Sequence, residues 1–212
     1  MKKVRILLLA VMLLPFLSKA QPEQSQKPHK HITHSVNAKN DSLVRGVSFS
    51  YFALSVPDFS DSTKKAFAIT AWKLWKQEKW KELEQFFTTN NLNGGWPPNR
   101  GATSLKIVTL KAGMLVDRFG GYYDADSVFQ DKGTFVSPAG IPFAQRALPA
   151  KTLSSPYRVY KVVKPITVVK RGGIIPWFNE PGLGTQFELP YTINDLKKGG
   201  YIAEEKNKKI PK

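Results

Sequence analysis

The chain has 212 residues, of which 42% are hydrophobic, so it is long enough for one domain with an ordinary apolar core. It carries 32 Lys and Arg residues against 16 Asp and Glu residues, for a net charge of +16, and it has no cysteine. The missing cysteines exclude disulfides and thiolate zinc sites. The basic charge favours polyanionic partners, which include nucleic acid, anionic envelope surfaces and phosphate-bearing small molecules, and charge alone does not choose among them.

Residues 1–20 have the pattern of a signal peptide. Lys2, Lys3 and Arg5 precede an apolar run over residues 6–17, and small residues follow at a cleavage signal over residues 18–20. The apolar run is shorter than the roughly 20 residues that span a bilayer, and no later stretch is both long enough and free enough of charge. We therefore expect a secreted or periplasmic protein with no membrane span after cleavage.

Residues 21–45 are polar and contain few large apolar side chains, so we expect a disordered basic and polar linker there. All three histidines, His29, His31 and His34, fall in this stretch without a carboxylate or thiolate framework. No metal site is therefore predicted. We expect one folded domain over residues 46–205, followed by a basic tail over residues 206–212.

The first part of the folded domain is predicted to contain a strand followed by helices. Alternation over residues 47–56 predicts a strand, and aromatic and apolar residues then recur at near-helical spacing over residues 64–87. This spacing predicts one or two amphipathic helices, within a helical part that covers about residues 60–92. Pro97 and Pro98 end the helical pattern in a loop.

A β-rich part follows over about residues 96–203. Short β-branched and aromatic runs alternate there with Gly and Pro, and a brief helix is predicted over residues 192–198. The order of the elements predicts an α+β fold, with N-terminal helices followed by a β-rich half that holds two small antiparallel or mixed sheets. The predicted strands cover residues 105–110, 134–137, 157–163, 166–169 and 186–189.

The residue inventory excludes several kinds of catalysis. From Val47 onward the chain has neither histidine nor cysteine, so a Ser-His-Asp triad, a Cys-His pair and a histidine or cysteine zinc site are unavailable. The pair Gly182 and Gly184 lacks the third glycine and the strand-to-helix context of a dinucleotide-binding fold. Arginine, glutamine, hydroxyl groups and a few carboxylates remain for polar chemistry.

An ordered series of motifs begins at Trp96 and extends to about Tyr201. Its most specific members are LVDRFG over residues 115–120, FVSPAGIPFAQRALP over residues 135–149, PYRVYKV over residues 156–162, and PWF with GTQF over residues 176–178 and 184–187. The series resembles the TNT family, named after the tuberculosis necrotizing toxin. The conjunction of motifs in order is far more specific than any one of them.

The resemblance implies an NAD glycohydrolase, a hydrolase that cleaves the nicotinamide–ribose N-glycosyl bond to give nicotinamide and ADP-ribose. NAD, or NADP as well, would be the substrate, and no cofactor is implied. A secreted toxin with a protein inhibitor as its immunity partner follows from the resemblance, and no nucleic-acid partner is expected. The residue inventory by itself permits NAD cleavage without singling it out, because the pyridinium leaving group departs neutral and needs no protonating acid.

The resemblance also nominates site residues. Arg118 and Arg146 fall where family members place arginines against NAD, and Gln186 falls on the glutamine implicated in the hydrolytic step. Phe135, at a position where some members carry tyrosine, would stack its ring against the substrate. Arg158 replaces a histidine that active members often have, and it could hold a phosphate or ribose oxygen but could not act as a base near neutral pH.

Three of these nominations have a structural alternative. Arg118 could simply pair with Asp117, Arg146 could cap a turn, and Phe135 could be a core residue. The predicted catalytic residues are Gln186, Arg118 and Arg158, and the predicted substrate-binding residues are Arg118, Arg146, Phe135 and Glu188.

Two further functions stay open. Gln186 and Glu188 lie two apart on a predicted strand and so share one face, as in the Gln/Glu-x-Glu arrangement of ADP-ribosyltransferases. An exposed strand glutamate is the commoner explanation for Glu188. The other alternative is a non-catalytic basic module that binds polyanions.

Overall fold

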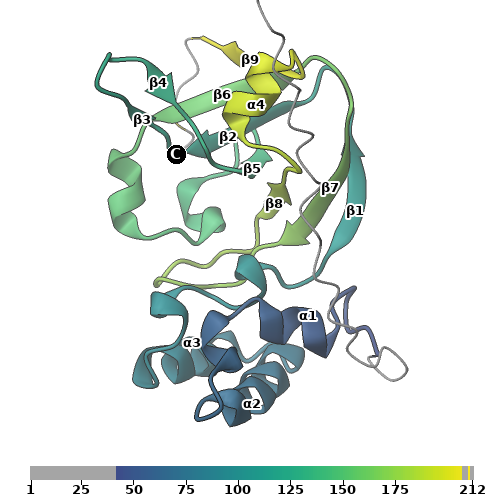
Figure 1. Ribbon diagram of the computed structural model, residues 1–212, viewed down its shortest axis with the longest axis vertical. Coiled ribbons are helices and arrows are strands. Elements are labelled where there is room, and N and C mark those ends of the chain that lie inside the picture. Colours follow the sequence, from purple (N-terminus) through teal and green to yellow (C-terminus); the bar gives the residue numbers. More distant parts are fainter. Residues whose placement is uncertain (1–41, 207–209, 211–212) are drawn as a thin grey trace, which may run out of the picture. The chain divides into compact units, whose positions relative to one another are not determined.

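The computed structural model describes residues 42–206 and residue 210, which belong to one compact unit (Figure 1). The predicted signal peptide, the three histidines, nearly all of the predicted linker and most of the basic tail lie outside the described residues. None of the helices in the described part is both long enough and apolar enough to cross a membrane.

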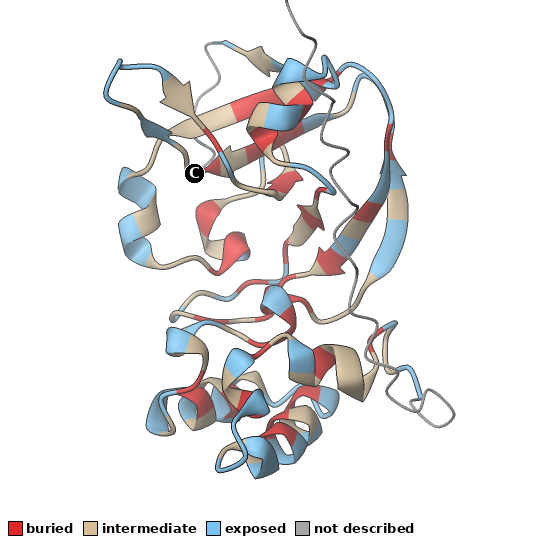
Figure 2. Ribbon diagram, viewed as in Figure 1, coloured by how far each residue is buried: buried red, intermediate tan, exposed pale blue. Residues whose placement is uncertain are grey.

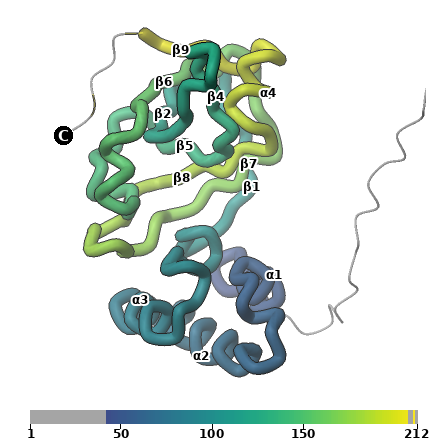
Figure 3. The backbone as a smooth tube through the Cα atoms, turned by 60° about the vertical axis from the view of Figure 1, so that its left-hand side comes forward, coloured from purple at the N-terminus to yellow at the C-terminus, as the bar shows by residue number. Residues whose placement is uncertain are grey.

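Helices come first and strands follow, which confirms the α+β class (Figures 1 and 3). The α-helices are α1 (Phe49–Leu54), α2 (Lys65–Lys76), α3 (Trp80–Thr89) and α4 (Ile193–Lys198). Short 3-10 helices cover Pro57–Ser60, Asn93–Gly95, Asn99–Gly101, Phe143–Arg146 and Ala150–Ser154.

Seven strands form one sheet in the order β1-β7-β8-β5-β2-β6-β9, and every neighbouring pair runs antiparallel. The second sheet is the two-stranded hairpin of β3 and β4. The strands are β1 (Lys106–Leu110), β2 (Leu115–Phe119), β3 (Tyr122–Tyr123), β4 (Phe129–Gln130), β5 (Phe135–Pro138), β6 (Tyr157–Val162), β7 (Ile166–Gly173), β8 (Thr185–Glu188) and β9 (Ile202–Glu205). Strands β1, β5, β6, β7 and β8 confirm predicted runs, whereas β2, β3, β4 and β9 were not predicted.

The strand predicted over residues 47–56 is wrong, because helix α1 occupies this segment. The hydroxyl of Ser48 accepts a hydrogen bond from the Tyr51 N–H at 3.1 Å and so caps the helix start. Phe52 is fully buried, with its ring centroid 5.1 Å from that of Trp72 and 5.7 Å from that of Trp75. Packing against these rings overrides the period-two alternation of the sequence.

An aromatic core joins α1, α2 and α3, as the near-helical spacing predicted. The rings of Trp72 and Trp75 stack with centroids 5.1 Å apart. The buried Trp75 indole N–H donates to the Ala102 carbonyl at 3.1 Å, and the Trp177 indole N–H donates to the Gly95 carbonyl at 2.8 Å. These two bonds tie the segment over residues 93–102 to α2 and to the connection between β7 and β8.

A second core lies between the seven-stranded sheet and α4, which contributes Ile193 and Leu196 (Figure 2). Thr192 caps α4 through a hydrogen bond from the Asp195 N–H to its hydroxyl at 3.1 Å, as the predicted helix start required. The packing of α4 on the sheet fixes the segment that precedes β5, because the Ile193 N–H donates to the Gly133 carbonyl at 3.0 Å.

Candidate active site

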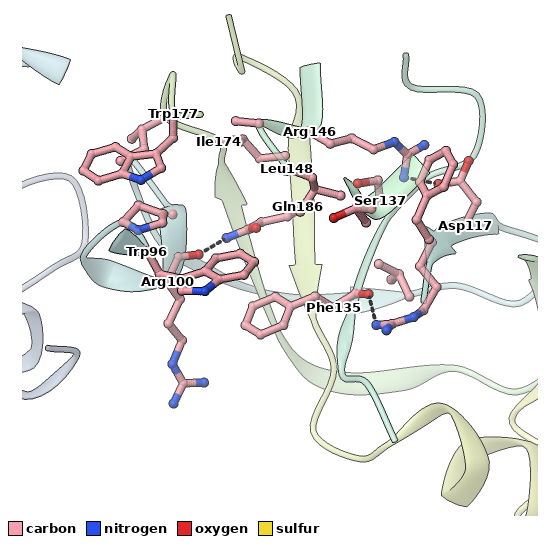
Figure 4. A pocket seen from close by; sticks show the side chains of 18 of the residues that line it. Trp96, Arg100, Asp117, Phe135, Ser137, Arg146, Leu148, Ile174, Trp177 and Gln186 are labelled. Carbon is pink, nitrogen blue, oxygen red and sulfur yellow. Dashed lines mark hydrogen bonds and ion pairs between the residues drawn. The ribbon is translucent and has the colours of Figure 1, made fainter. Parts of the chain in front are cut away.

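A cavity of about 530 Å³ opens between the β-rich half and the segment over residues 93–101 (Figure 4). This volume falls within the range of small-molecule sites, roughly 300–1,000 Å³. Polar and aromatic side chains from distant parts of the chain meet there. The lining includes Trp96, Arg100, Asp117, Arg118, Phe119, Phe135, Ser137, Arg146, Thr152, Trp177 and Gln186.

Four of the six predicted site residues line this cavity, namely Gln186, Arg118, Arg146 and Phe135. They come from β8, β2, the 3-10 helix Phe143–Arg146 and β5. The pairing of β5 with both β2 and β8 brings three of these elements side by side. The other two predicted residues, Arg158 and Glu188, are not part of the lining.

Arg146 is held by a buried ion pair with Asp117. Its Nη1 lies 2.7 Å from the Asp117 carboxylate, and the side chains are 4% and 0% exposed. The Nε and Nη2 groups of Arg146 both donate to the Ile141 carbonyl, at 3.1 and 2.7 Å. Because both sides of the guanidinium are bound, Arg146 presents a fixed charge to the cavity.

Asp117 also accepts hydrogen bonds from two other groups. The Tyr157 hydroxyl donates to its Oδ2 at 2.7 Å, and the Gly140 N–H donates to the same oxygen at 3.0 Å. Burial raises the pKa of Tyr157 above its usual value of 10.0, and the hydrogen bond to Asp117 raises this pKa further. Tyr157 therefore stays a protonated donor to Asp117 across the physiological pH range.

Arg118, which follows Asp117 on β2, is bound in a similar way. Its Nε lies 2.9 Å from a carboxylate oxygen of Asp131, which is 1% exposed, and its Nη1 donates to the Phe135 carbonyl at 2.8 Å. Asp131, rather than the adjacent Asp117, is thus the ion-pair partner of Arg118. The sequence neighbour was the wrong candidate because successive strand residues point to opposite faces of a sheet.

Gln186 is oriented by a main-chain group. Its side-chain amide donates to the Arg100 carbonyl at 2.9 Å (Figure 4). A carbonyl can only accept, so the NH₂ group must face Arg100 and the amide oxygen must face away. Within residues 42–206 and 210, that oxygen accepts no hydrogen bond, so it is available to a ligand or a water molecule.

The turn that carries the Arg100 carbonyl has an unusual backbone. Asn99 and Arg100 have φ values of 49° and 52°, in the left-handed region. Asn99 is buried, donates its N–H to the Ser55 hydroxyl at 2.7 Å, and donates its side-chain amide to the Ala102 carbonyl at 2.8 Å. These bonds hold a conformation that costs non-glycine residues free energy, and such conformations cluster at functional sites.

Glu188 lies beside Gln186 on β8 and forms ion pairs with Arg100 and with Lys170, the latter at 3.5 Å. Its carboxylate is therefore engaged by two cations rather than aimed into the cavity. Arg158 faces Arg118 across the β2–β6 pair, but it binds Glu204 at 3.1 Å and the Tyr123 hydroxyl at 2.9 Å. Its guanidinium also lies 4.7 Å from the Phe129 ring centroid.

Sequence reasoning did not nominate Trp96 or Arg100, which line the cavity, or the carboxylates of Asp117 and Asp131, which hold two of its three arginines. Trp96 carried a signal, because it opens the motif series and stands before two prolines. It is 49% exposed, with its ring packed edge-on against Phe178 at 5.2 Å. Asp131 carried no signal, because only the tertiary fold brings it to Arg118.

The site is a small-molecule cavity on an α+β domain, with arginine charges that favour an anionic ligand and aromatic faces that favour a planar one. Among the described residues, no group of three or more His, Asp or Glu side chains could hold a metal ion.

The family model "Tuberculosis necrotizing toxin" (TNT) matches residues 109–204, so this segment is a TNT domain. The conidial surface nicotinamide adenine dinucleotide glycohydrolase nadA of Aspergillus fumigatus is 40% identical over 101 residues, which cover 44% of this chain. The match spans 39% of the length of the fungal protein.

Two solved structures are more distant. The tuberculosis necrotizing toxin complexed with its immunity factor IFT is 22% identical, with a TM-score of 0.41 over 51% of this chain and 60% of the toxin. Rhs1-CT in complex with its cognate immunity protein RhsI1 is 20% identical, with a TM-score of 0.36 over 53% of this chain and 86% of Rhs1-CT.

Proposed function

We propose that the protein is an NAD glycohydrolase that cleaves the nicotinamide–ribose bond of NAD to give nicotinamide and ADP-ribose. The observation that carries this proposal is the convergence of Gln186, Arg118, Arg146 and Phe135 of the TNT domain on one cavity. The fungal relative with 40% identity, named as an NAD glycohydrolase, supports the same activity.

The reaction needs little acid–base chemistry from the protein. The carbon–nitrogen bond breaks with its electron pair going to the pyridinium nitrogen, so nicotinamide leaves neutral. Water then adds to the ribose carbon and releases one proton. The protein must stabilise the positive charge that develops on the ribose and orient the water. The free amide oxygen of Gln186, fixed by the bond to the Arg100 carbonyl, can accept a hydrogen bond from that water.

The two held arginines suit the pyrophosphate of NAD. Each pairs with a carboxylate on one side, Arg118 with Asp131 and Arg146 with Asp117, and so has a fixed orientation before substrate arrives. A guanidinium has five N–H donors, so donors remain on both side chains for phosphate oxygens. Fixed donors bind without losing side-chain entropy at that moment, which favours affinity.

Aromatic side chains provide faces for the rings of the substrate. Phe135 and Trp96 both line the cavity, from opposite halves of the domain (Figure 4). A planar adenine or nicotinamide ring can stack on either face. Phe135 lacks a hydroxyl, so in this proposal it acts by stacking only.

A direct role on the substrate has less support for Arg158 and Glu188 than for the four lining residues. Arg158 contacts Glu204 and Tyr123, so a direct role on the substrate would require its side chain to move. Glu188 is paired with Arg100 and Lys170, which disfavours the Gln-x-Glu arrangement of a transferase. Labelled NAD separates the two reactions, because hydrolysis leaves the label in free ADP-ribose when cell extract is present.

We further propose an exported toxin whose catalytic domain covers residues 46–205. The signal-like pattern over residues 1–20 supports export to a secreted or periplasmic location, and the fungal relative is named as a conidial surface protein. NAD is scarce outside cells, so an exported NAD hydrolase is useful when delivered into a competitor or host. The producing cell would then need a protein inhibitor.

The test follows NAD consumption and nicotinamide release by the protein without residues 1–20, beside folded Arg118→Ala and Gln186→Ala variants. We expect equal release of nicotinamide and ADP-ribose by the parent protein and a large loss in both variants. Intact NAD with all three proteins folded would refute the activity. Binding to polyanions with a steep salt dependence and no turnover would then favour the basic-module alternative.

A further inference from the structure

We propose that Asp131, Gly120 and Gly133 form a socket, called the Arg118 socket, that sets the guanidinium of Arg118 toward the cavity. Asp131 and Gly133 are therefore positioning residues for anion binding. The consequence for catalysis rests on the proposed NAD glycohydrolase function, whereas the socket itself rests on contacts within the chain.

Asp131 provides the carboxylate of the socket. One carboxylate oxygen lies 2.9 Å from Arg118 Nε, and Oδ1 accepts the Gly133 N–H at 2.9 Å. The main chain of Asp131 is fixed as well, because its N–H donates to the Asn194 side chain at 2.9 Å and its carbonyl accepts the Asn194 N–H at 3.0 Å. The main chain that carries this carboxylate is thus anchored to α4.

The two glycines leave the room that the guanidinium occupies. A Cβ built on Gly133 would fall under 3.0 Å from Nη1, Nη2 and Cζ of Arg118, and one built on Gly120 would fall that close to Nη2. Gly120 has a φ of 148°, so its backbone also favours glycine. Gly133 is not among the positive-φ glycines, so its backbone admits alanine and only the space beside Arg118 calls for a glycine.

The socket leaves one edge of Arg118 for a ligand. Nε is bound by Asp131, and Nη1 donates to the Phe135 carbonyl at 2.8 Å. In the part of the chain that the structure describes, Nη2 makes no hydrogen bond, and Arg118 lines the cavity. The socket also couples the arginine to Phe135, whose ring lines the same cavity, so one displacement would disturb two proposed contacts.

Gly133→Ala tests the socket without removing any polar group. We expect the dissociation constant for ADP-ribose and the KM for NAD to rise about 10- to 100-fold, the equivalent of one charge-assisted hydrogen bond. The kcat should change less, because a contact made equally in the ground and transition states affects KM. Gly199→Ala is the matched control, since Gly199 also has an ordinary negative φ of −76° and lies away from the cavity lining.

A double-mutant cycle separates positioning from general damage. The parent protein, Gly133→Ala, Arg118→Ala and the double variant are compared in ADP-ribose binding and in thermal unfolding. If the alanine methyl acts by displacing Arg118, Gly133→Ala has no further effect on binding in the Arg118→Ala background. It also lowers the Tm by less in that background, because the side chain with which the methyl clashes is gone.

Asp131→Asn gives an independent check. The amide keeps an oxygen for the Gly133 N–H but then turns its NH₂ group toward Arg118 Nε, so two donors face each other. We expect a rise in KM as large as that of Gly133→Ala, again absent when Arg118 is alanine.

The outcomes are distinct. Additive effects of Gly133→Ala and Arg118→Ala in both binding and Tm would overturn the socket, whatever the activity. A parent protein that neither binds ADP-ribose nor cleaves NAD would refute the proposed function, and the Tm cycle alone would then decide the socket. Non-additive binding together with non-additive Tm supports the proposal.

Discussion

The two walls of the cavity are built in different ways. The wall from the β-rich half carries charge, because Arg118 and Arg146 are each fixed by a buried carboxylate. The wall that follows the helices contributes the Trp96 ring and the Arg100 carbonyl, and the aromatic core fixes this wall through the indole N–H of Trp75. The TNT match over residues 109–204 covers the charged wall and stops short of the other. In the proposed function, the first wall therefore binds substrate charge and carries hydrolysis, and the second stacks on a ring and orients Gln186.

Removing the carboxylate of the charged wall should have the largest effect. Asp117→Ala leaves the buried Arg146 guanidinium without its counter-charge, and breaking a buried ion pair in this way costs about 3–5 kcal/mol. We expect the free energy of unfolding, measured with urea, to fall by this amount. The double variant with Arg146→Met should regain part of the loss, because the unpaired charge is gone. A fall below about 1 kcal/mol for Asp117→Ala would show that the pair does not fix this wall.

Gln186→Ala tests the side chain that joins the two walls through its hydrogen bond to the Arg100 carbonyl. Its amide oxygen is free and its NH₂ group is bound to Arg100, so alanine removes the proposed water contact without removing a buried charge. We expect kcat to fall about 100-fold or more, a typical loss for one positioned polar group. The exposed Gln145, which does not line the cavity, provides the matched Gln145→Ala control. Equal kcat values for the two variants would remove Gln186 from the mechanism.

Trp96→Ala tests the wall that follows the helices. Stacking of a base on an aromatic side chain contributes about 1–3 kcal/mol, so we expect the KM for NAD to rise about 10-fold. The Tm should change little, because Trp96 is 49% exposed. Tyr191, an exposed aromatic residue away from the cavity lining, gives the control variant Tyr191→Ala. An unchanged KM would show that the helical side contributes no ring contact.

Asp58→Asn tests a polar contact that supports the wall that follows the helices, and its effect should be the smallest. The Asp58 carboxylate binds Lys64 at 2.9 Å and accepts the Asn93 N–H at 2.7 Å. The hydrogen bond from Lys64, followed by the bond from Asn93, holds the pKa of Asp58 below its usual value of 3.8. The contribution to stability is therefore present above that pH and is lost as the pH falls through the lowered pKa of the folded state.

At neutral pH, Asp58→Asn should lower the free energy of unfolding by about 1 kcal/mol or less. The difference from the parent protein should vanish at acid pH, once the carboxylate is protonated in both the folded and unfolded states. Urea titrations across the pH range measure it. A difference that does not depend on pH would mean that the charge of Asp58 is irrelevant and that only the shape of the side chain matters.

Local patterns predicted most of the fold. The spacing of Trp72, Trp75, Leu83 and Phe86 predicted the region of α2 and α3, and five strands were predicted near their observed positions. The residues of α1 alternate like a strand, and only the distant rings of Trp72 and Trp75 decide otherwise. Strands β2 and β9 were not predicted; β9 pairs with β6, and β2 lies between β5 and β6.

Motifs in the sequence could name candidate site residues. They could not predict the ion-pair partners of these residues, because only the fold brings those partners close. Four of the residues that the motif series named, Gln186, Arg118, Arg146 and Phe135, line one cavity, and their roles there stay predictions. The motif series could not show that Arg158 is bound by Glu204, which lies far along the chain, because that contact depends on the pairing of β6 with β9.

The carbonyl that holds Gln186 belongs to the main chain of Arg100 and not to its side chain. A substitution at position 100 changes the side chain at the cavity mouth but leaves the carbonyl in place, provided that the new residue accepts a φ near 52°. Glycine and asparagine accept this backbone readily. The side chain that lines the cavity at position 100 can therefore vary while the bond that orients the Gln186 amide is kept.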